Sequence, residues 1–363
     1  MCVAYYLVKA GLRTLNIDQG YITAGTSGAG NGNIIVGNRQ PGLLAELARR
    51  SLLEYERMGN GEMGDFELER NGSYLLLETE AQAEEARQLI ARQEGRGLSL
   101  AYLSAGELAE AVPGVSAKLA GAVYCRDDCS LNPLLFLRAL RRRIQDHGGG
   151  FAFYEKVGKI QRTPSGLFCV YTGAGTYRSP VVVDCAGVQA RPIASLLGEQ
   201  VPVAPNKGHI VVTEKVPHLR IPAKLRDWAD ASDSQEGEPV NTVIESTAAG
   251  NLLIGKSEAG TESSASVSLP TVRAILDRAL RFLPCLREVK VIRIYTGLRP
   301  RSGDGLPIIG ASAITAGLYY ACGHGGDGVS SAPETGRLLS RRIAEGRSER
   351  IMREFAPARF IKP

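Results

Sequence analysis

The first 18 residues, MCVAYYLVKAGLRTLNID, place the strongest constraint on the fold of this chain. Val3 and Leu7 belong to an apolar pattern with helical spacing, and Gly11 provides a helix stop. The segment LRTLNI at 12–17 is typical of a short buried strand, and Asp18 follows it directly. A helix, a tight turn and a strand that ends in an acid form the second half of a dinucleotide-binding βαβ unit. The pattern therefore predicts an α/β fold.

The first half of such a unit, a strand and a glycine-rich phosphate loop, belongs before this helix. The acid of the unit follows the first glycine by about 20 residues, and counting back that far from Asp18 passes Met1. From the residues alone, Asp18 has two interpretations. It either hydrogen-bonds the ribose hydroxyls of an adenine dinucleotide or is an aspartate in a surface turn.

A long glycine-rich segment, at 19–42, follows this acid. Glycine is unfavourable in helices and strands alike, so we expect a loop, and long loops inside compact domains are usually functional. Its central part, AGTSGAGNGN at 24–33, offers backbone N–H groups and the hydroxyls of Thr26 and Ser27 without bulky side chains. Such a loop suits the close approach of a phosphate or an isoalloxazine ring. A merely flexible loop is the alternative.

The order of helical and strand patterns indicates two domains that alternate along the chain. Segments with α/β character lie at both ends, whereas residues 201–294 are mostly strand-like and favour an antiparallel sheet with one helix. A short helix at 104–114 is predicted by a capping box, with Ser104 as the N-cap and Glu107 three residues later. The predicted division places one domain at 1–60, 121–200 and 294–363, and the other at 61–120 and 201–293.

The composition of the 363 residues is that of an ordinary globular protein, with 44% hydrophobic and 22% charged residues. The formal net charge of +5 is small for this length. The densest basic stretch, RALRRRIQD at 138–146, has the spacing of a solvated helix face, so we expect no nucleic-acid binding. No apolar run is long enough to span a membrane, and no signal-peptide pattern is present, which favours a cytoplasmic protein.

The seven cysteines show no repeated CxxC spacing. Cys125 and Cys129 form one CxxxC pair, but neither a second pair nor a histidine partner completes a metal site. We therefore expect buried, reduced thiols, no metal and no iron–sulfur centre in this chain.

Two motifs near the C-terminus, YTGLRPRSGDGLPIIG at 295–310 and GLYYACGHGGDGVSSAPETG at 317–336, carry the clearest chemical signal. The glycines of the second motif form a turn that opens a helix, whose N-terminus has unpaired N–H groups and a partial positive charge. Such an end stabilises the anion formed when a flavin accepts a hydride. Arg299, restrained by Pro300, suits bidentate binding of a substrate carboxylate, with a surface ion pair as the alternative. His324 is either a base or a turn histidine that bonds the backbone.

On these motifs the chain resembles the D-amino acid oxidase-like FAD-dependent amine oxidoreductases, which include glycine oxidase, sarcosine oxidase and D-amino acid dehydrogenase. The resemblance extends over nearly the whole chain, through VAYYLVKAGLRTLNID, GTSGAGNGN, DDCSLNP, VVVDCAGVQA, GLRPRSGDGLPIIG, GHGGDGV and FAPARF. The loop GTSGAGNGNIIVGNRQPG is most similar to the flavin subunits of opine oxidases, hydroxyproline dehydrogenases and cyanide-forming glycine dehydrogenases.

Members of this family begin with a strand and GxGxxG, which this sequence lacks. The resemblance therefore implies an N-terminally truncated chain. Either its start is an internal methionine of a longer reading frame, or it is a shortened product. The missing strand lies centrally in the family's sheet, so its loss is expected to expose apolar faces and to remove contacts with the pyrophosphate.

The resemblance also implies an FAD-binding Rossmann-like domain, an antiparallel substrate domain and roles for particular residues. Arg299 is expected to bind the substrate carboxylate, and Asp18 the adenosine ribose. The other expected contacts with FAD are Thr26, Ser27, Gly28 and Asn31 in the glycine loop, Val157, Ala186 and Gly187 beside the dinucleotide, and Gly325, Gly326, Asp327, Gly328 and Val329 at the pyrimidine edge of the flavin. Asp327 is expected to point away, because a carboxylate there would oppose the reduced anion.

The expected reaction is FAD-dependent oxidation of the C–N bond of a small amino or imino acid by hydride transfer to the flavin. Alignment and desolvation are expected to supply much of the barrier reduction, without a side-chain acid or base. Oxygen, an electron-accepting partner subunit and a quinone stay open as acceptors. Two alternatives to this reaction are a flavin-free remnant without activity and a flavoenzyme that acts on an α-hydroxy acid.

Overall fold

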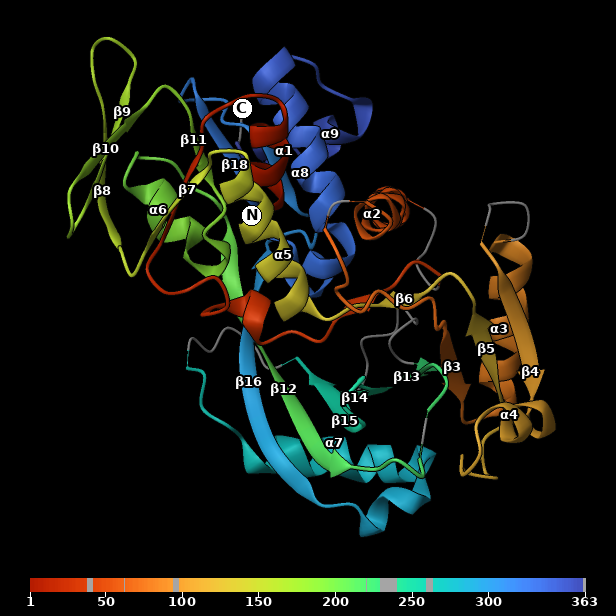
Figure 1. Ribbon diagram of the computed structural model, residues 1–363. Helices are drawn as coiled ribbons and strands as arrows, with labels where there is room; N and C mark the ends of the chain where they lie inside the picture. Colours follow the sequence, from red (N-terminus) through yellow and green to blue (C-terminus); the bar gives the residue numbers. More distant parts are fainter. Residues whose placement is uncertain are drawn as a thin grey trace.

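The computed structural model describes residues 1–37, 42–61, 63–93, 98–219, 221–228, 240–258 and 264–361. Predictions that extend beyond these ranges, such as the end of the glycine-rich segment at 38–41, lie outside the described residues. Figure 1 shows an upper part with short sheets and several helices, and a lower part with one large sheet. Both ends of the sequence lie in the upper part, so the predicted α/β architecture, discontinuous along the chain, is confirmed.

The large sheet has eight strands, and its neighbours are antiparallel except for β13 and β3, which are parallel. The strands lie in the order β16 (Val291–Ser302), β12 (Val203–Lys215), β15 (Asn251–Ser257), β14 (Val240–Ser246), β13 (Lys224–Asp227), β3 (Ser73–Leu77), β5 (Gly121–Cys125) and β4 (Leu100–Ser104). The sheet is therefore mixed, and wider than the antiparallel sheet predicted for 201–294. The difference comes from pairing between segments far apart in sequence, which no local pattern records.

One face of the large sheet is covered by α7 (Leu269–Phe282), which lies against it in Figure 1. Ile275 and Phe282 of the helix pack against Val211 and Ile254 of the sheet in one buried cluster. Because successive side chains of a strand point to opposite faces, the neighbour of Val211, Ile210, faces the other way and lines a cavity. The large sheet therefore has one core face and one cavity face.

Two small sheets in the upper part face the same cavity. In one, β1 (Leu15–Asp18) pairs in parallel with β7 (Gly150–Phe153). In the other, β11 (Val182–Asp184) pairs in parallel with β18 (Leu318–Cys322), and β18 pairs with β17 (Ile308–Ala311). Within the described ranges β1 and β11 each have one neighbour, and residues of both line the cavity between them. Apolar side chains are exposed at this edge, as at Leu15, which is 44% exposed.

The helices of the upper part pack around these small sheets. The helix predicted at the N-terminus is α1 (Cys2–Lys9), and it contacts α8 (Gly328–Glu345) so closely that a Cβ on Gly336 would lie 2.6 Å from the Cys2 backbone. Asn132 accepts hydrogen bonds at the start of α5 (Pro133–Asp146). The remaining elements are α2 (Leu43–Gly59), α3 (Glu80–Gln93), α4 (Ala105–Ala111), α6 (Ala190–Ser195), α9 (Arg350–Phe355), β2 (Asn33–Ile34), β6 (Cys129–Ser130), β8 (Val157–Arg162), β9 (Phe168–Thr172) and β10 (Thr176–Ser179).

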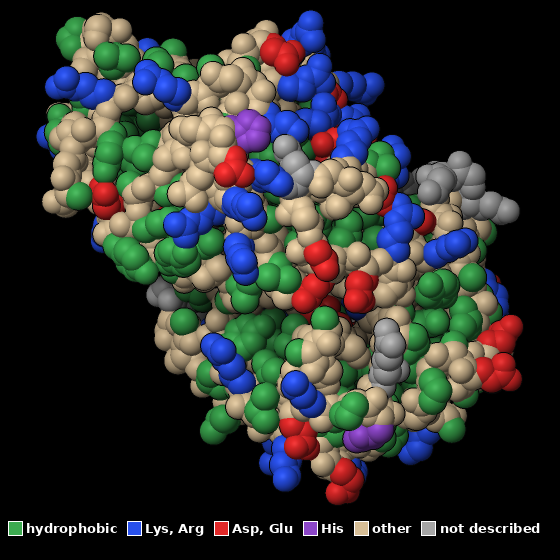
Figure 2. All heavy atoms as spheres, viewed as in Figure 1, with side chains coloured by type: hydrophobic (Ala, Val, Ile, Leu, Met, Phe, Trp, Pro, Cys, Tyr) green, Lys and Arg blue, Asp and Glu red, His purple; other side chains and the backbone are tan. Residues whose placement is uncertain are grey.

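Basic side chains gather near the top of the view in Figure 2, over α8 and α9. Arg337 of α8 lies 2.6 Å from the buried carboxylate of Glu334. Arg50 of α2 lies 2.6 Å from Glu349, which precedes α9. Arg337 also lies 3.0 Å from Glu349, so Glu349 joins α2 and α8 to the start of α9, and part of this basic surface serves helix packing.

The structure can be compared with the predictions of local structure. The capping box of α4 is confirmed, since Ser104 and Glu107 bond each other's backbone N–H. The strands β10 and β11 are separated after Ser179, where Pro180 cannot donate a ladder hydrogen bond. The predicted domain boundaries at 121 and 294 stay predictions, and the strands nearest them, β5 and β16, both lie in the large sheet.

All seven cysteines are free thiols, and five of them are buried. The expectation of burial is wrong for Cys185 and Cys285, which are exposed. Among the described residues, no three His, Cys, Asp or Glu side chains come together as a metal site. No helix within those ranges is both long and apolar enough to cross a membrane.

Candidate active site

A cavity of about 2060 Å³ lies between the large sheet and the small sheets. Ligand pockets for single small molecules usually hold about 300–1,000 Å³, so this cavity has room for a large and a small ligand together. We call its lining on the large sheet the sheet floor: Gly208, Ile210, Arg226, Val243, Gly255, Gly297 and Arg299. We call the opposite lining the loop wall: Asp18, Thr26, Ser27, Asn31, Val157, Ala186, Gly187 and residues 325–329.

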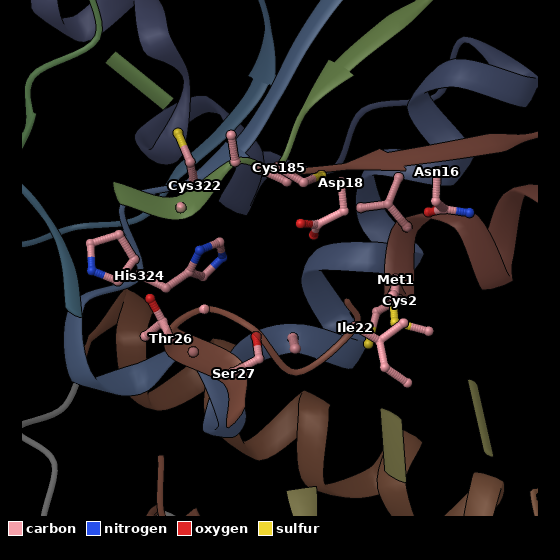
Figure 3. A pocket seen from close by; sticks show the side chains of 18 of the residues that line it. Met1, Cys2, Asn16, Asp18, Ile22, Thr26, Ser27, Cys185, Cys322 and His324 are labelled. Atoms are coloured by element: carbon pink, nitrogen blue, oxygen red, sulfur yellow. The ribbon is translucent and has the colours of Figure 1, made fainter. Parts of the chain in front are cut away.

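The loop wall brings together segments from the whole length of the chain. Asp18 ends β1, Val157 begins β8, and Ala186 follows β11. Figure 3 shows the carboxylate of Asp18 pointing into the cavity, with Thr26 and Ser27 on another side. One oxygen of Asp18 accepts a hydrogen bond from the Gly20 N–H at 2.9 Å, which fixes the carboxylate at the strand end. All of the predicted cofactor residues except Gly28 therefore surround one cavity.

The glycine loop rests on the strand that carries Arg299. Thr26 Oγ1 donates a 2.6 Å hydrogen bond to the carbonyl oxygen of Leu298. A Cβ on Gly297 would lie 2.8 Å from the Ala29 Cβ, so glycine permits this close approach. Gly28 does not line the cavity: a Cβ there would lie 2.0 Å from the Thr23 carbonyl oxygen, so it packs within the loop.

The glycines that follow β18 bring the N-terminus of α8 to the cavity. Gly323 and Gly325 have φ angles of +70° and +55°, a backbone conformation that glycine adopts readily. Gly325 to Asp327 form a single 3₁₀ turn, and α8 starts at Gly328. The side chain of Asp327 makes no cap hydrogen bond with the helix. The first turn of α8 therefore presents backbone N–H groups and a partial positive charge to the cavity.

His324 lies in the cavity wall between β18 and this turn, as Figure 3 shows. Its Nε2 atom is 3.2 Å from Thr335 Oγ1. Burial lowers the pKa of His324 to about 4, so its imidazole is neutral at neutral pH and is a weak base. The geometry favours a wall residue held by Thr335 over a general base.

Arg299 lies half-buried on β16, at the end of the sheet floor nearest the glycine loop. Its Nη1 atom donates to the Ser257 carbonyl at 2.8 Å and lies 3.4 Å from Asn206 Oδ1. These two acceptors orient the guanidinium. The guanidinium lies over Gly208, where a Cβ would be 2.4 Å from Nη2. A glycine at 208 thus makes space for the arginine head group.

A buried acid that the sequence analysis did not single out lies beside the loop wall. Asp184 ends β11, is 3% exposed and lines the cavity. Its Oδ1 atom accepts the Ala186 N–H at 2.9 Å, while Oδ2 has no hydrogen-bond partner among the described residues. Burial raises the pKa of Asp184 to about 7. The sequence signal for this buried acid was an aspartate directly after three valines, in VVVD at 181–184.

The sequence analysis also missed Gly208, Asn206 and Arg226 of the sheet floor and its surroundings. The sequence contained a weak signal for Arg226. Two basic residues, Lys224 and Arg226, flank Leu225 in the segment KLRD, which is unusual for a buried strand. Together the two linings offer a carboxylate and a helix N-terminus on one side and an oriented guanidinium on the other. This arrangement suits an elongated cofactor along the loop wall and an anionic small molecule on the sheet floor.

Comparison with known proteins agrees with this geometry. The sequence profile described as DAO, FAD dependent oxidoreductase, matches residues 1–342. The chain is 28% identical over 298 residues to hydrogen cyanide synthase subunit HcnC of Pseudomonas aeruginosa, an alignment that covers 82% of this chain and 68% of that protein. It is 27% identical over 300 residues to an opine oxidase subunit of Rhizobium meliloti, with coverages of 82% and 76%.

A glycine oxidase of Bacillus licheniformis is 26% identical over 349 residues, which covers 94% of this chain and 89% of the relative. Among solved structures, the glycine oxidase of Geobacillus kaustophilus superposes with a TM-score of 0.89 at 25% identity, over 99% of this chain and 96% of that one.

Proposed function

The chain belongs to the FAD dependent oxidoreductase (DAO) family, and on that premise we propose that it oxidises the C–N bond of a small amino or imino acid. When bound, FAD supplies the oxidising chemistry by accepting a hydride from the carbon next to the nitrogen. The observation that carries the choice of substrate is Arg299, a guanidinium oriented over Gly208 in the sheet floor. The similarity to glycine oxidases and to a component of an opine oxidase supports the same choice.

The residues present fit FAD. Asp18 offers a carboxylate at a strand end, where it would hold the adenosine ribose. A Cβ on Gly325 would have no heavy atom within 4 Å, so a flat ring can approach the N-terminus of α8 there. The Oδ2 atom of buried Asp184 has no hydrogen-bond partner among the described residues, and it is an acceptor that suits a donor placed in the cavity. Thr26, Ser27 and the residues of the loop wall named above would complete the contacts.

The chain's own residues then position the substrate. Arg299 would hold the substrate carboxylate by two parallel hydrogen bonds, which fixes the orientation of the α-carbon. The N-terminus of α8 favours negative charge on the side of the cavity that it faces. Ile210 and Val243 exclude water from the sheet floor, so these electrostatic effects act at low dielectric. The neutral amine needs no side-chain base, and the imine product hydrolyses after release.

The proposal for the electron acceptor is based on the relatives of the chain. Two relatives are named as subunits, of a hydrogen cyanide synthase and of an opine oxidase. We propose on this basis that a partner subunit takes electrons from the reduced protein, with oxygen and a quinone as competing acceptors. We place the protein in the cytoplasm, on the sequence argument alone.

A single-turnover experiment tests the proposed function. The chain is purified with FAD and mixed without oxygen with glycine, alanine or proline, and the loss of oxidised flavin absorbance is followed. Arg299→Met is expected to lower the second-order rate constant roughly 30- to 4000-fold, since removing one partner of a buried charge pair costs about 2–5 kcal/mol. Arg301→Met is the control, because Arg301 lies on the same strand but does not line the cavity.

Each other outcome has a definite meaning. Faster reduction by glycolate or lactate than by the amino acids would show an α-hydroxy acid oxidase. A colourless protein after purification with FAD would support a flavin-free remnant. An equal loss of rate in the Arg299 and Arg301 variants would contradict the role of Arg299.

A further inference from the structure

The direction of the Arg299 head group depends on a neighbouring strand of the large sheet, β15. Arg299 Nη1 donates to the backbone carbonyl of Ser257 at 2.8 Å. Ser257 is the last residue of β15 and is 1% exposed, so its side chain lies inside the protein. Whatever holds Ser257 in place therefore also sets where its carbonyl points and how it orients Arg299.

The side chain of Ser257 is held by His209 of β12. His209 Nδ1 lies 2.9 Å from Ser257 Oγ, and the backbone N–H of His209 donates to the same oxygen at 3.2 Å. Gly208 and Ile210, on either side of this histidine, line the cavity, so the imidazole points to the core face of the large sheet, where it is 0% exposed. Ser257 thus joins a buried histidine of the core face to an arginine that lines the cavity.

The start of α7 fixes the tautomer of His209. The backbone N–H of Ser268, the N-cap residue of α7, donates to His209 Nε2 at 3.0 Å. A nitrogen that accepts an N–H carries no proton, so the proton of the neutral imidazole lies on Nδ1. Nδ1 therefore donates to Ser257 Oγ. The two ring nitrogens have different tasks: one accepts from the helix start, and the other donates to the residue that orients Arg299.

A separate contact joins the same segment to β16. Thr296 lies opposite His209 in the pairing of β12 with β16, and its Oγ1 donates to the Ala265 carbonyl. The segment before α7 accordingly runs beside β16 (Figure 1). This contact does not involve Ser257, so Thr296 provides a matched control for the bond between His209 and Ser257.

We propose that His209 is a positioning residue for substrate binding: its Nδ1–H group holds Ser257, and the carbonyl of Ser257 orients Arg299 toward the substrate carboxylate. His209 does not line the cavity and acts only through these two residues. The inference rests on the proposed function, because it takes Arg299 as the group that binds the carboxylate. It follows that the donor at Nδ1, rather than the acceptor at Nε2, affects the affinity for a carboxylate ligand.

Two substitutions of His209 separate the tasks of its nitrogens. Asparagine can place an amide N–H near the position of Nδ1, and glutamine can place an amide oxygen near that of Nε2. The FAD-loaded protein is titrated by calorimetry with propionate, a carboxylate without an amine. His209→Gln is expected to raise the Kd about 3- to 10-fold, the range for loss of one neutral hydrogen bond, whereas His209→Asn should stay within about twofold of the wild type.

Stability distinguishes this role from a structural one. His209→Asn leaves the Ser268 N–H without its acceptor, so its free energy of unfolding should fall at least as far as that of His209→Gln. A Kd that follows stability across the two variants would overturn the inference. Thr296→Val removes the contact with Ala265 and should leave the Kd unchanged; a rise equal to that of His209→Gln would also overturn it. Ser257→Ala keeps the carbonyl but removes the acceptor, and it replaces His209→Gln if that variant does not fold.

A double-mutant cycle with Arg299 completes the test. Arg299→Met should weaken propionate binding, and His209→Gln should add no further loss in that background, because the histidine acts through the guanidinium. Additive losses would overturn the inference.

The cycle also separates this inference from the proposed function. If propionate binding depends on Arg299 but not on His209, the positioning role is wrong and the proposed function stands. If no amino acid reduces the flavin while propionate binding depends on both residues, the proposed oxidation is wrong and the positioning role stands.

Discussion

The two linings of the cavity differ in how their residues are held. The sheet floor belongs to one continuous sheet, in which β12 pairs with β16 from Val203 to Thr213. The loop wall is assembled from a glycine loop, a helix N-terminus and the ends of β1 and β11, which lie in two separate small sheets. Residues on a continuous sheet are fixed by many cooperative hydrogen bonds, whereas loops and short strands open locally at lower cost. We therefore expect rigid substrate positioning and a more adaptable cofactor side.

One buried acid lies beside each lining, and the two acids differ in how many hydrogen bonds they accept. Asp128, beside the sheet floor, accepts three hydrogen bonds of 2.6–2.9 Å. Asp184, beside the loop wall, accepts a single hydrogen bond among those described, from the Ala186 N–H. The small sheets thus contain a buried acid that the local structure solvates poorly, in a place where a bound cofactor can supply further donors.

The largest expected effect is therefore on stability at Asp184. Its folded-state pKa, raised to about 7, exceeds the unfolded value of about 3.9, so the folded state binds the proton more tightly. The contribution of Asp184 to the free energy of unfolding of the cofactor-free chain should fall as pH rises from about 4 to about 7, by up to about 4 kcal/mol in total. Asp184→Asn should remove this contribution, so the free energy of unfolding of the variant relative to the wild type should rise between about pH 5 and pH 8, as measured by urea unfolding.

Asp277→Asn is the matched control, since this acid of α7 has a side chain that is 66% exposed. It should leave the pH dependence unchanged. A stability difference between Asp184→Asn and the wild type that is the same at both pH values would mean that Asp184 is better solvated than its burial indicates.

The next largest expected effect compares a glycine-to-alanine substitution on the sheet floor with one in the glycine loop. In Gly208→Ala the new Cβ would lie 2.4 Å from Arg299 Nη2, so the guanidinium must move away from its position. We expect KM for the amino acid to rise about 10- to 100-fold, which corresponds to about 1.4–2.8 kcal/mol, with little loss of stability. Gly25→Ala in the glycine loop is the control, because no heavy atom lies within 4 Å of its Cβ position. Equal KM values for Gly208→Ala and Gly25→Ala would contradict the inference that Gly208 makes space for the head group of Arg299.

The smallest expected effect is on FAD affinity at Asp18. Asp18→Asn keeps an acceptor oxygen for the Gly20 N–H but removes the negative charge offered to the ribose hydroxyls. We expect the Kd for FAD to rise about tenfold, at the lower end for a hydrogen bond to a charged group, with kcat unchanged at saturating FAD. Fluorescence titration of FAD measures the Kd, and Asp277→Asn should not change it.

Local signals were enough to predict many elements of this fold. The capping box at Ser104 and Glu107 is complete within a few residues, and α4 starts where this signal predicts. The helix-turn-strand pattern of the first 18 residues likewise predicted α1 and β1, because a helix stop and a short strand pattern are local properties, but the predicted burial of the strand is wrong at Leu15, which is 44% exposed.

The sheet floor could not be predicted in the same way. The parallel pairing of β13 with β3 joins Arg226 to Leu75, residues about 150 positions apart, and no periodicity reports such a partner. The cluster of Asp128, Lys224 and Arg226 depends on that pairing. Arg299 was found because its motif is contiguous, whereas Gly208, which makes space for its head group, lies on another strand.

The hydrogen bond from Thr26 Oγ1 to the Leu298 carbonyl joins the two linings directly. The loop that would contact the cofactor therefore touches the residue next to Arg299, the arginine that we propose binds the substrate carboxylate. If cofactor binding shifts this loop, we expect the free energy of substrate binding to change, which is a coupling between two sites. Such coupling is reciprocal: whatever factor FAD contributes to substrate affinity, the substrate contributes to FAD affinity. Saturation with either ligand would then slow the loss of the other.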